Sequence, residues 1–223
     1  MTPSRPLILV SGFGPFPGVP VNPSAAVAAE LARTADVDSL AGATVAALAL
    51  DTDWHDGPAR LQCTIKQRNP TAVVMFGVSR KARCVVIETL ARNQMAAVDN
   101  RDRMPTASVI DSHGPRFRVT RCWPARQLVS QLRALGIPAI RSRNAGTYLC
   151  NRVLYDTLAA CQHSPALKVC GFVHIPLGLV ESAHPDRPCH LTWDQAVRAG
   201  QIVVRSLAVR YGQALPGSVS AVA

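Results

Sequence analysis

The sequence predicts an α/β fold: a three-layer α/β/α sandwich with a mainly parallel, twisted sheet. Short apolar runs of strand length alternate along the chain with longer stretches of helical periodicity. The strand-length runs are apolar throughout, which is typical of parallel strands covered on both faces. With 223 residues, 48% of them hydrophobic, the chain can bury a sizeable core and is not a disordered protein.

Six apolar runs have the length and the β-branched content of buried strands. They are residues 7–10, 44–50, 71–76, 84–87, 137–140 and 167–175. In folds of this kind ligands bind outside the carboxyl ends of strands. The loops after residues 10, 76, 140 and 175 are therefore the places to look for a site.

Five segments are predicted as helices: 23–33, 54–68, 124–135, 147–160 and 192–210. The first has a start signal, with Asn22 as N-cap and Pro23 in the first turn. The last opens with a capping box made by Thr192 and Gln195.

Residues 1–211 are expected to form one domain, because no internal repeat or linker interrupts them. Residues 100–123 have weak periodicity and predict a long surface excursion. Residues 212–223 are rich in small side chains and predict a flexible tail.

Charge and composition exclude several classes of protein. Lys and Arg total 24 against 14 Asp and Glu, a formal charge of +10. The basic residues are scattered and no aromatic ladder accompanies them, so an arginine-biased surface is favoured over a nucleic-acid binder. No apolar run is long enough for a membrane helix. Seven cysteines without a CxxC pair predict a reduced, cytoplasmic protein.

Three residues suggest nucleophilic chemistry. Cys150 falls in the first turn of a predicted helix, where the helix dipole and free N–H groups favour a thiolate. His174 lies near the end of the following strand, and we expect the strand–helix–strand connection to bring both residues to the same sheet edge. Glu88 closes an earlier strand and can orient the imidazole. Spacing alone leaves open the plainer interpretation that Cys150 packs in the core and His174 is a hydrogen-bonded side chain.

Four segments carry a family resemblance in collinear order. They are residues 11–18 (SGFGPFPG) with 22–24 (NPS), residues 87–93 (IETLARN), residues 144–151 (NAGTYLCN) and residues 171–176 (GFVHIP). Together they resemble the motifs of the type I pyroglutamyl peptidases, also called pyrrolidone-carboxylate peptidases. The resemblance extends over about residues 7–210.

The resemblance implies a cysteine peptidase that removes an N-terminal pyroglutamyl residue from peptides. It implies an α/β/α sandwich, a cytoplasmic location, no cofactor, and assembly as a homodimer or homotetramer. Its motifs place the nucleophile at Cys150, the general base and acid at His174 and the orienting carboxylate at Glu88. The expected partner is a peptide with a blocked N-terminus; no nucleic acid or membrane is expected.

The expected substrate pocket contains Phe13, Phe16, Val78, Tyr148 and Leu149. In the family, the phenylalanines that match Phe13 and Phe16 clamp the flat pyrrolidone ring; the alternative is that they plug their loop onto the core. Val78 stands where the family has a glutamine, and Tyr148 and Leu149 stand where it has Phe-Val. The triad is intact while the frame around the substrate differs.

These differences leave two other functions open. The same triad can act on a different cyclic or acylated N-terminal group, or the chain can be an inactive homologue that binds peptides. A metal site is not expected, since the Cys161/His163 and Cys170/His174 spacings suit no common zinc site.

Overall fold

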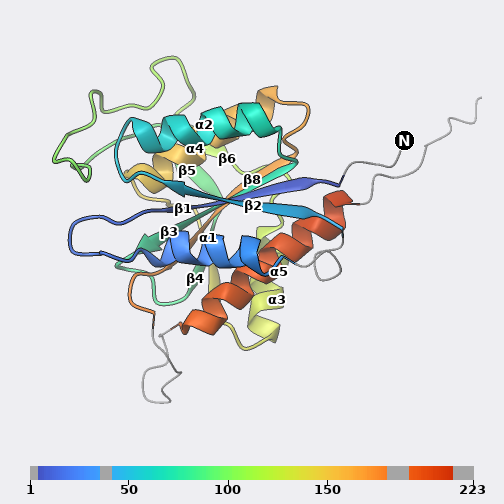
Figure 1. The fold of residues 1–223 in the computed structure, drawn as a ribbon. Coiled ribbons are helices and arrows are strands. Elements are labelled where there is room, and N and C mark those ends of the chain that lie inside the picture. Colours follow the sequence, from blue (N-terminus) through green and yellow to red (C-terminus); the bar gives the residue numbers. More distant parts are fainter. Residues whose placement is uncertain (1–4, 36–41, 180–190, 213–223) are drawn as a thin grey trace, which may run out of the picture.

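The computed structural model describes residues 5–35, 42–179 and 191–212 (Figure 1). A six-stranded sheet with the order β2-β1-β3-β8-β4-β7 forms its centre. The strands are β1 (Leu7–Phe13), β2 (Thr44–Leu50), β3 (Ala72–Ser79), β4 (Val85–Glu88), β7 (Ala139–Ser142) and β8 (Val169–Pro176). The chain leaves β1 toward β2 on one side and returns to β3 on the other, so the sheet has a topological switch point at β1.

The sheet is mainly parallel, as predicted, with one reversal. Strands β2, β1, β3 and β8 run parallel to one another, whereas β4 is antiparallel to β8. Edge strand β7 is parallel to β4, so these two strands point the opposite way. This seam between β8 and β4 places residues from oppositely directed strands opposite one another.

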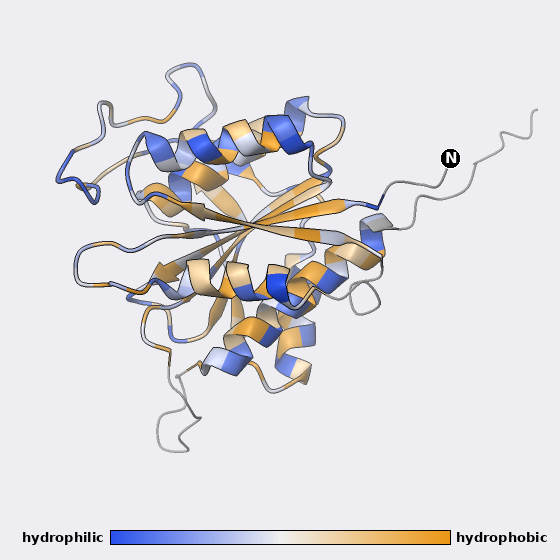
Figure 2. Cartoon of the chain, in the orientation of Figure 1, coloured by the Kyte–Doolittle hydropathy of each residue, from blue (hydrophilic) through white to orange (hydrophobic). Residues whose placement is uncertain are grey.

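Helices cover both faces, which confirms the three-layer sandwich. Helices α1 (Pro23–Arg33), α3 (Ala125–Ala134) and α5 (Trp193–Gly212) pack on one face, and α2 (Asp56–Arg68) and α4 (Leu149–His163) pack on the other (Figure 1). Each interface forms its own apolar cluster. The strands are almost entirely hydrophobic and the helices carry polar residues on their outer sides (Figure 2).

The capping signals in the sequence act as expected. The Asn22 side chain accepts a hydrogen bond from the N–H of Ser24 at the start of α1. At α5, Thr192 and Gln195 exchange two hydrogen bonds of 3.1 Å between backbone N–H groups and side-chain oxygens. These reciprocal bonds satisfy donors that a helix start otherwise leaves free.

Most boundaries differ from the prediction by a few residues, and two of these differences have a clear local reason. The helix predicted from residue 54 begins at Asp56, because the Asp53 carboxylate accepts the N–H groups of His55 and Asp56 and caps α2 from outside. The strand predicted at 137–140 occupies 139–142 instead. Ile137 is buried, but it belongs to the turn that follows α3.

Residues 100–123 are a surface excursion, but one that contains a strand. Strand β6 (Phe117–Val119) pairs antiparallel with β5 (Leu90–Arg92) in a small separate sheet. The Asn93 side chain accepts hydrogen bonds from the N–H groups of Ile110 and Asp111. A single amide thus organises the base of the loop, which apolar periodicity could not reveal.

None of the helices within the described ranges is long and apolar enough to cross a membrane. Cys63, Cys122, Cys150, Cys161 and Cys170 form no disulfide. The tail predicted for residues 212–223 lies outside the described residues, except for Gly212 at the end of α5.

Gly12 lies where β1 and α1 approach each other closely. A Cβ atom at Gly12 would clash with the backbone carbonyl of Ser24, whereas one at Gly14 would lie an ordinary 3.5 Å from the carbonyl oxygen of Leu50. We expect Gly12→Ala to lower the free energy of unfolding by about 1–3 kcal/mol. Gly14→Ala should change it by less than about 1 kcal/mol. Urea unfolding of both variants measures the difference; equal effects would contradict this packing.

Candidate active site

Cys150 lies in the first turn of α4, as predicted, on the helix layer above β3 and β8. Tyr148 is the N-cap residue and its side chain caps no N–H group. Among the described residues, no hydrogen bond is donated by the backbone N–H of Leu149 or Cys150. Cys150 therefore belongs to the positive end of the helix dipole, in a turn whose first N–H groups are unpaired.

Gly77 lies beneath the sulfur and has a specific spatial role. A Cβ atom at Gly77 would lie 2.9 Å from Cys150 Sγ and 2.6 Å from the ring of Phe172. Gly77 also pairs directly with His174 across the β3–β8 ladder. The missing side chain is what allows the cysteine to approach the sheet at this point.

His174 lies on β8, on the face of the sheet covered by α4, and is only 7% exposed. Its Nδ1 is 3.0 Å from Oε1 of Glu88. A carboxylate can only accept, so Nδ1–H donates to Glu88 and Nε2 remains available to Cys150. The Phe172 ring packs against the imidazole at a centroid distance of 4.7 Å.

The Glu88 carboxylate is buried and hydrogen-bonded at both oxygens. It is 2% exposed, and its second oxygen, Oε2, accepts the backbone N–H of Asn144 at 3.3 Å. The carboxylate therefore has one partner on each oxygen. Two hydrogen bonds fix its direction, which fixes the plane of the imidazole in turn.

Two opposing influences act on the His174 imidazole. Burial lowers the pKa of His174, but the charge and hydrogen bond of Cys150, together with those of Glu88, outweigh burial and raise the pKa to about 9. The imidazole thus remains protonated beside the sulfur across neutral pH. The predicted neighbours Cys150, His174 and Glu88 are brought together by the fold.

The sequence predicted that these residues meet at one edge of the sheet, where neighbouring strands end. The structure brings them together in a different way. Because β4 runs against β8, Glu88 pairs with Phe172, two residues before His174. Ser142 at the carboxyl end of β7 pairs with Glu88 at that same level. The carboxyl ends of β4 and β7 therefore meet β8 inside its length, and Glu88 reaches along the sheet to the imidazole.

A pocket of about 230 Å³ opens beside Cys150. All five predicted pocket residues line it: Phe13, Phe16, Val78, Tyr148 and Leu149. The lining is completed by Asn22, Thr52, Arg80 and Leu177, together with Cys150 itself. The pocket is small and mainly apolar, and none of the described residues that line it is acidic.

The two phenylalanines differ in what they do. Phe13 is 3% exposed and packs in the α2/α4 core, and it also lines the pocket. Phe16 is half-buried and lies in the loop that follows β1. Val19 exchanges two backbone hydrogen bonds with Phe16, which closes this loop into a tight turn.

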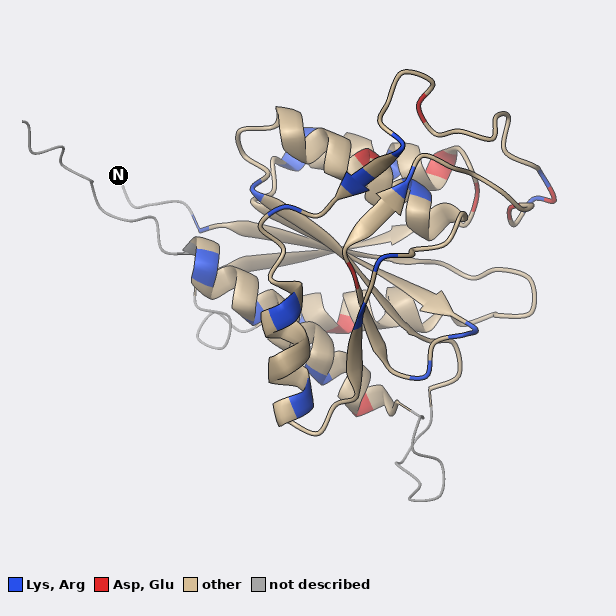
Figure 3. Cartoon of the chain, turned by 180° about the vertical axis from the view of Figure 1, so that it is seen from behind, with Lys and Arg blue, Asp and Glu red and all other residues tan. Residues whose placement is uncertain are grey.

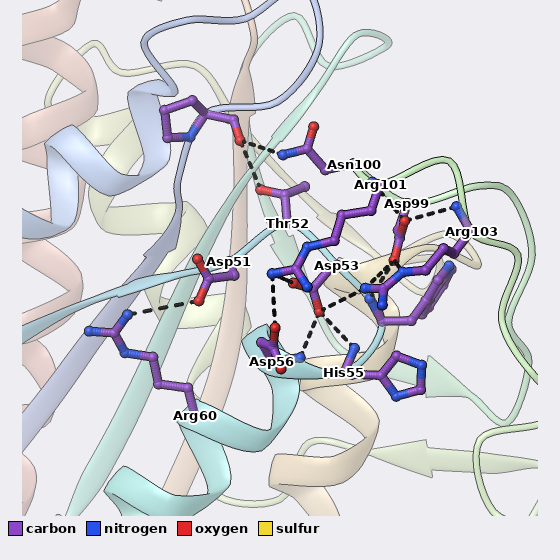
Figure 4. Close-up of polar contacts among 12 residues, drawn as sticks. Asp51, Thr52, Asp53, His55, Asp56, Arg60, Asp99, Asn100, Arg101 and Arg103 are labelled. Atoms are coloured by element: carbon purple, nitrogen blue, oxygen red, sulfur yellow. Dashed lines mark hydrogen bonds and ion pairs between the residues drawn. The ribbon is translucent and has the colours of Figure 1, made fainter.

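Polar side chains hold the phenylalanine loop in place. The Asn22 amide donates to the carbonyl oxygen of Gly14 at 2.9 Å, and the Thr52 hydroxyl lies 3.2 Å from the same oxygen. The Asn100 amide donates to the carbonyl oxygen of Pro15 at 3.3 Å (Figure 4). Residues from α1, the end of β2 and the excursion thus hold one pocket wall.

A network of carboxylates and guanidinium groups supports this wall (Figure 4). Asp99, 4% exposed, accepts hydrogen bonds from the N–H groups of Trp54, Arg101 and Arg103. Arg103 also pairs with Asp99 at 3.2 Å, and Arg101 pairs with Asp53 at 3.2 Å. Burial raises the pKa of Asp99, but hydrogen bonds from Arg103, Trp54 and Arg101 outweigh it and lower the pKa to about 2.

Tyr148 is the aromatic wall opposite the loop. Its ring packs edge-on against Trp54 at a centroid distance of 5.3 Å. Burial, followed by the negative charges of Asp99, Cys150 and Asp53, raises the pKa of Tyr148 to about 12. The phenol of Tyr148 therefore stays neutral across neutral and moderately alkaline pH.

Asn151 is an important residue of the site to which sequence reasoning gave no role. It is fully buried; its Oδ1 accepts the N–H of Arg92, and its Nδ2 donates to the carbonyls of Arg92 and Gln94. These bonds fasten the first turn of α4 to β5. The available signal was an amide on an otherwise apolar helix face, which requires buried partners.

Cys161 and Cys170, the two cysteines considered for a metal site, contact each other. The Cys161 and Cys170 side chains are hydrogen-bonded together, and Cys161 Sγ lies 3.3 Å from the carbonyl oxygen of Leu167. Within the described ranges no three His, Cys, Asp or Glu side chains are grouped to hold a metal ion.

The contacts from Glu88 through His174 to Cys150 are those of a hydrolase with a cysteine nucleophile. The sequence pattern of the pyroglutamyl peptidase family matches residues 7–210. The chain belongs to this family.

Individual relatives agree. The chain is 34% identical over 186 residues to pyrrolidone-carboxylate peptidase 1 of Ralstonia nicotianae, covering 82% of this chain and 84% of that one. It is 30% identical to the Clavibacter michiganensis enzyme, with 90% and 92% covered. The crystal structure of Bacillus amyloliquefaciens pyroglutamyl peptidase I superposes with a TM-score of 0.80 at 27% identity, over 92% of this chain and 98% of that one.

Asp99 gives a pH-dependent test of the supporting network. Because its pKa is lowered from 3.8 to about 2, the ionised carboxylate stabilises the fold at neutral pH. Asp99→Asn should lower the free energy of unfolding at pH 7 by about 2 kcal/mol. The gap to the wild type should close as the pH falls from about 4 through 2, where the wild-type carboxyl also becomes neutral.

Asp102→Asn is the matched control, since Asp102 is exposed and lies in the same loop. Its left-handed backbone (φ 55°) suits asparagine equally well. Urea unfolding at several pH values measures both variants. A stability gap for Asp99→Asn that does not change with pH would refute the role of its charge.

Proposed function

We propose that Cys150, His174 and Glu88 are the catalytic residues of a pyroglutamyl peptidase, and that the adjoining pocket holds the pyroglutamyl ring. The observation that carries the proposal is the composition of that pocket. Among the described residues, its walls are aromatic and aliphatic and include no carboxylate, and the only charged group besides the reacting sulfur of Cys150 is the cation Arg80. A free terminal ammonium would find no counter-ion there, whereas a flat neutral lactam fits.

The proposed reaction has two stages. The Cys150 sulfur attacks the carbonyl carbon of the pyroglutamyl residue, and a C–S bond forms while the carbonyl electrons move onto oxygen. The amides at the start of α4 are suited to stabilise this oxyanion. As the C–N bond breaks, His174 gives its proton to the leaving amine, and a thioester remains.

Water completes the cycle. His174, now neutral, accepts a proton from water, and the resulting hydroxide attacks the thioester carbon. The C–S bond breaks, free pyroglutamate leaves and the sulfur regains its starting state. Glu88 keeps Nδ1 protonated throughout, so that Nε2 always faces the reacting atoms.

The side chains of Val78 and Arg80 leave open a substrate other than a pyroglutamyl peptide. Both line the pocket, in the segment that differs most from the family motif. A valine cannot hydrogen-bond a ring carbonyl, and the loss of such a partner weakens discrimination. The alternative is the same triad acting on a different N-terminally blocked group.

Location and assembly are further proposals. Cys63, Cys122, Cys150, Cys161 and Cys170 form no disulfide, which suits the cytoplasm. A homodimer or homotetramer is supported by exposed apolar side chains on neighbouring surfaces of α3 and α5, with Leu135 49% exposed and Val209 52% exposed. We further propose that residues 1–211 form a single domain.

Turnover of a chromogenic pyroglutamyl amide tests the function directly. We expect hydrolysis by the wild type and a loss of at least about 10³-fold in kcat for Cys150→Ala. Cys63→Ala is the matched control, because Cys63 is an exposed cysteine on α2, and it should retain full activity. Iodoacetamide labelling of Cys150 without turnover would indicate a different blocking group. Neither labelling nor turnover would indicate a peptide-binding homologue.

The pH profile tests the roles of His174 and Glu88. The imidazolium must supply a proton, so kcat/KM should fall on the alkaline side with an apparent pKa near 9. Glu88 raises the pKa of His174, so Glu88→Gln should move this alkaline limb to lower pH. Glu30→Gln, which alters an exposed pair with Arg33, should leave the profile in place. An alkaline limb unmoved by Glu88→Gln would overturn the proposed role of Glu88.

A further inference from the structure

A second and larger cavity, of about 840 Å³, shares no lining residue with the catalytic pocket. It lies where the edge strand β7 meets the end of β6, the start of α3 and the last turn of α5. Four arginines line it: Arg126 on α3, Arg141 and Arg143 at the end of β7, and Arg210 on α5. We call this cavity the arginine groove.

The positive charge of the arginine groove has no carboxylate partner in the described part of the chain. None of the described residues that line the groove is acidic. Within the described ranges none of its four arginines forms an ion pair, although several arginines elsewhere do. Seen from behind, this part of the molecule carries basic residues with few acidic ones between them (Figure 3). Like charges gathered in a concavity repel one another and raise the local concentration of anions.

Neutral donors add to the cations. Helix α3 begins at the groove, and its N-cap residue Pro124 provides no side-chain acceptor. Within the described ranges the backbone N–H groups of Arg126 and Gln127 have no acceptor either. Trp123, only 7% exposed, closes the groove on its inner side, and its buried Nε1 does not reach the surface of the groove. The two unpaired N–H groups at the start of α3 can serve an oxyanion.

We propose that the arginine groove binds a linear oligophosphate, either inorganic or as part of a nucleoside triphosphate. Guanidinium groups bind phosphate oxygens bidentately, and four of them from three elements can contact successive phosphates. The volume is that of a small-molecule site. A nucleic-acid strand is less well suited, because the one aromatic ring in the lining, Trp123, is buried and presents no face for stacking.

Calorimetric titration of the full chain with sodium tripolyphosphate, in 150 mM salt, tests this proposal. We expect one site per chain and at least roughly tenfold weaker binding for both Arg126→Glu and Arg143→Glu. Arg198→Glu is the matched control: Arg198 is exposed on α5 but does not line the groove. It should weaken binding by less than about threefold, through net charge alone. Circular dichroism melting confirms that each variant is folded.

Parallel titrations identify the source of the phosphates. Equal affinity for tripolyphosphate and ATP supports recognition of the phosphate chain alone, and tighter binding of ATP supports a nucleoside triphosphate. Three results would overturn the proposal: no binding of tripolyphosphate, equal weakening by Arg198→Glu, or tighter arginine-dependent binding of a single-stranded oligonucleotide. None of these readouts depends on peptidase activity, so the proposal stands or falls separately from the proposed function.

Discussion

The hydrogen bond between Glu88 and His174 is the interaction on which the site depends. Both side chains are almost completely buried, and an ionisable group in that position is costly unless it is paired. Glu88 is compensated by the imidazole and by the amide of Asn144, and His174 by the carboxylate and the sulfur. The chain of partners runs without a gap from a backbone N–H to Cys150. Removing one member leaves a buried group without its partner, so structure and chemistry depend on the same contacts.

The reversal of strand direction at β4 makes this hydrogen bond possible. An antiparallel neighbour sets Val86 opposite His174 and Glu88 opposite Phe172, so all four side chains share one face of the sheet. A carboxylate two residues along the ladder then lies within reach of the imidazole. The sheet supplies two of the three groups from rigid strands, and only the sulfur comes from the helical layer. Sites built on strands and helices hold their geometry more closely than sites built on loops.

Much of this could be read from the sequence, for identifiable reasons. The strands of the parallel part are continuous apolar runs, and the helix starts at Asn22 and Thr192 carry recognisable caps. The direction of β4 could not be read, because an apolar strand of four residues looks the same in either direction. The five pocket residues were found through family motifs. Asn22, Thr52 and Arg80 were not placed in the pocket, because their positions depend on how loops fold back over the strand ends. The clamp made by Asn151 and the β5–β6 pair depend on contacts between segments far apart in sequence.

Gly77 has a consequence that reaches beyond packing. The sulfur of Cys150 occupies space that any other residue at position 77 would fill with its own first carbon. The absence of a side chain at position 77 thus leaves room for the nucleophile. No other residue type can replace this glycine without crowding the sulfur. Substitutions at the pocket residues Val78, Arg80 or Tyr148 can change which substrate fits. They preserve the nucleophile only while position 77 remains glycine.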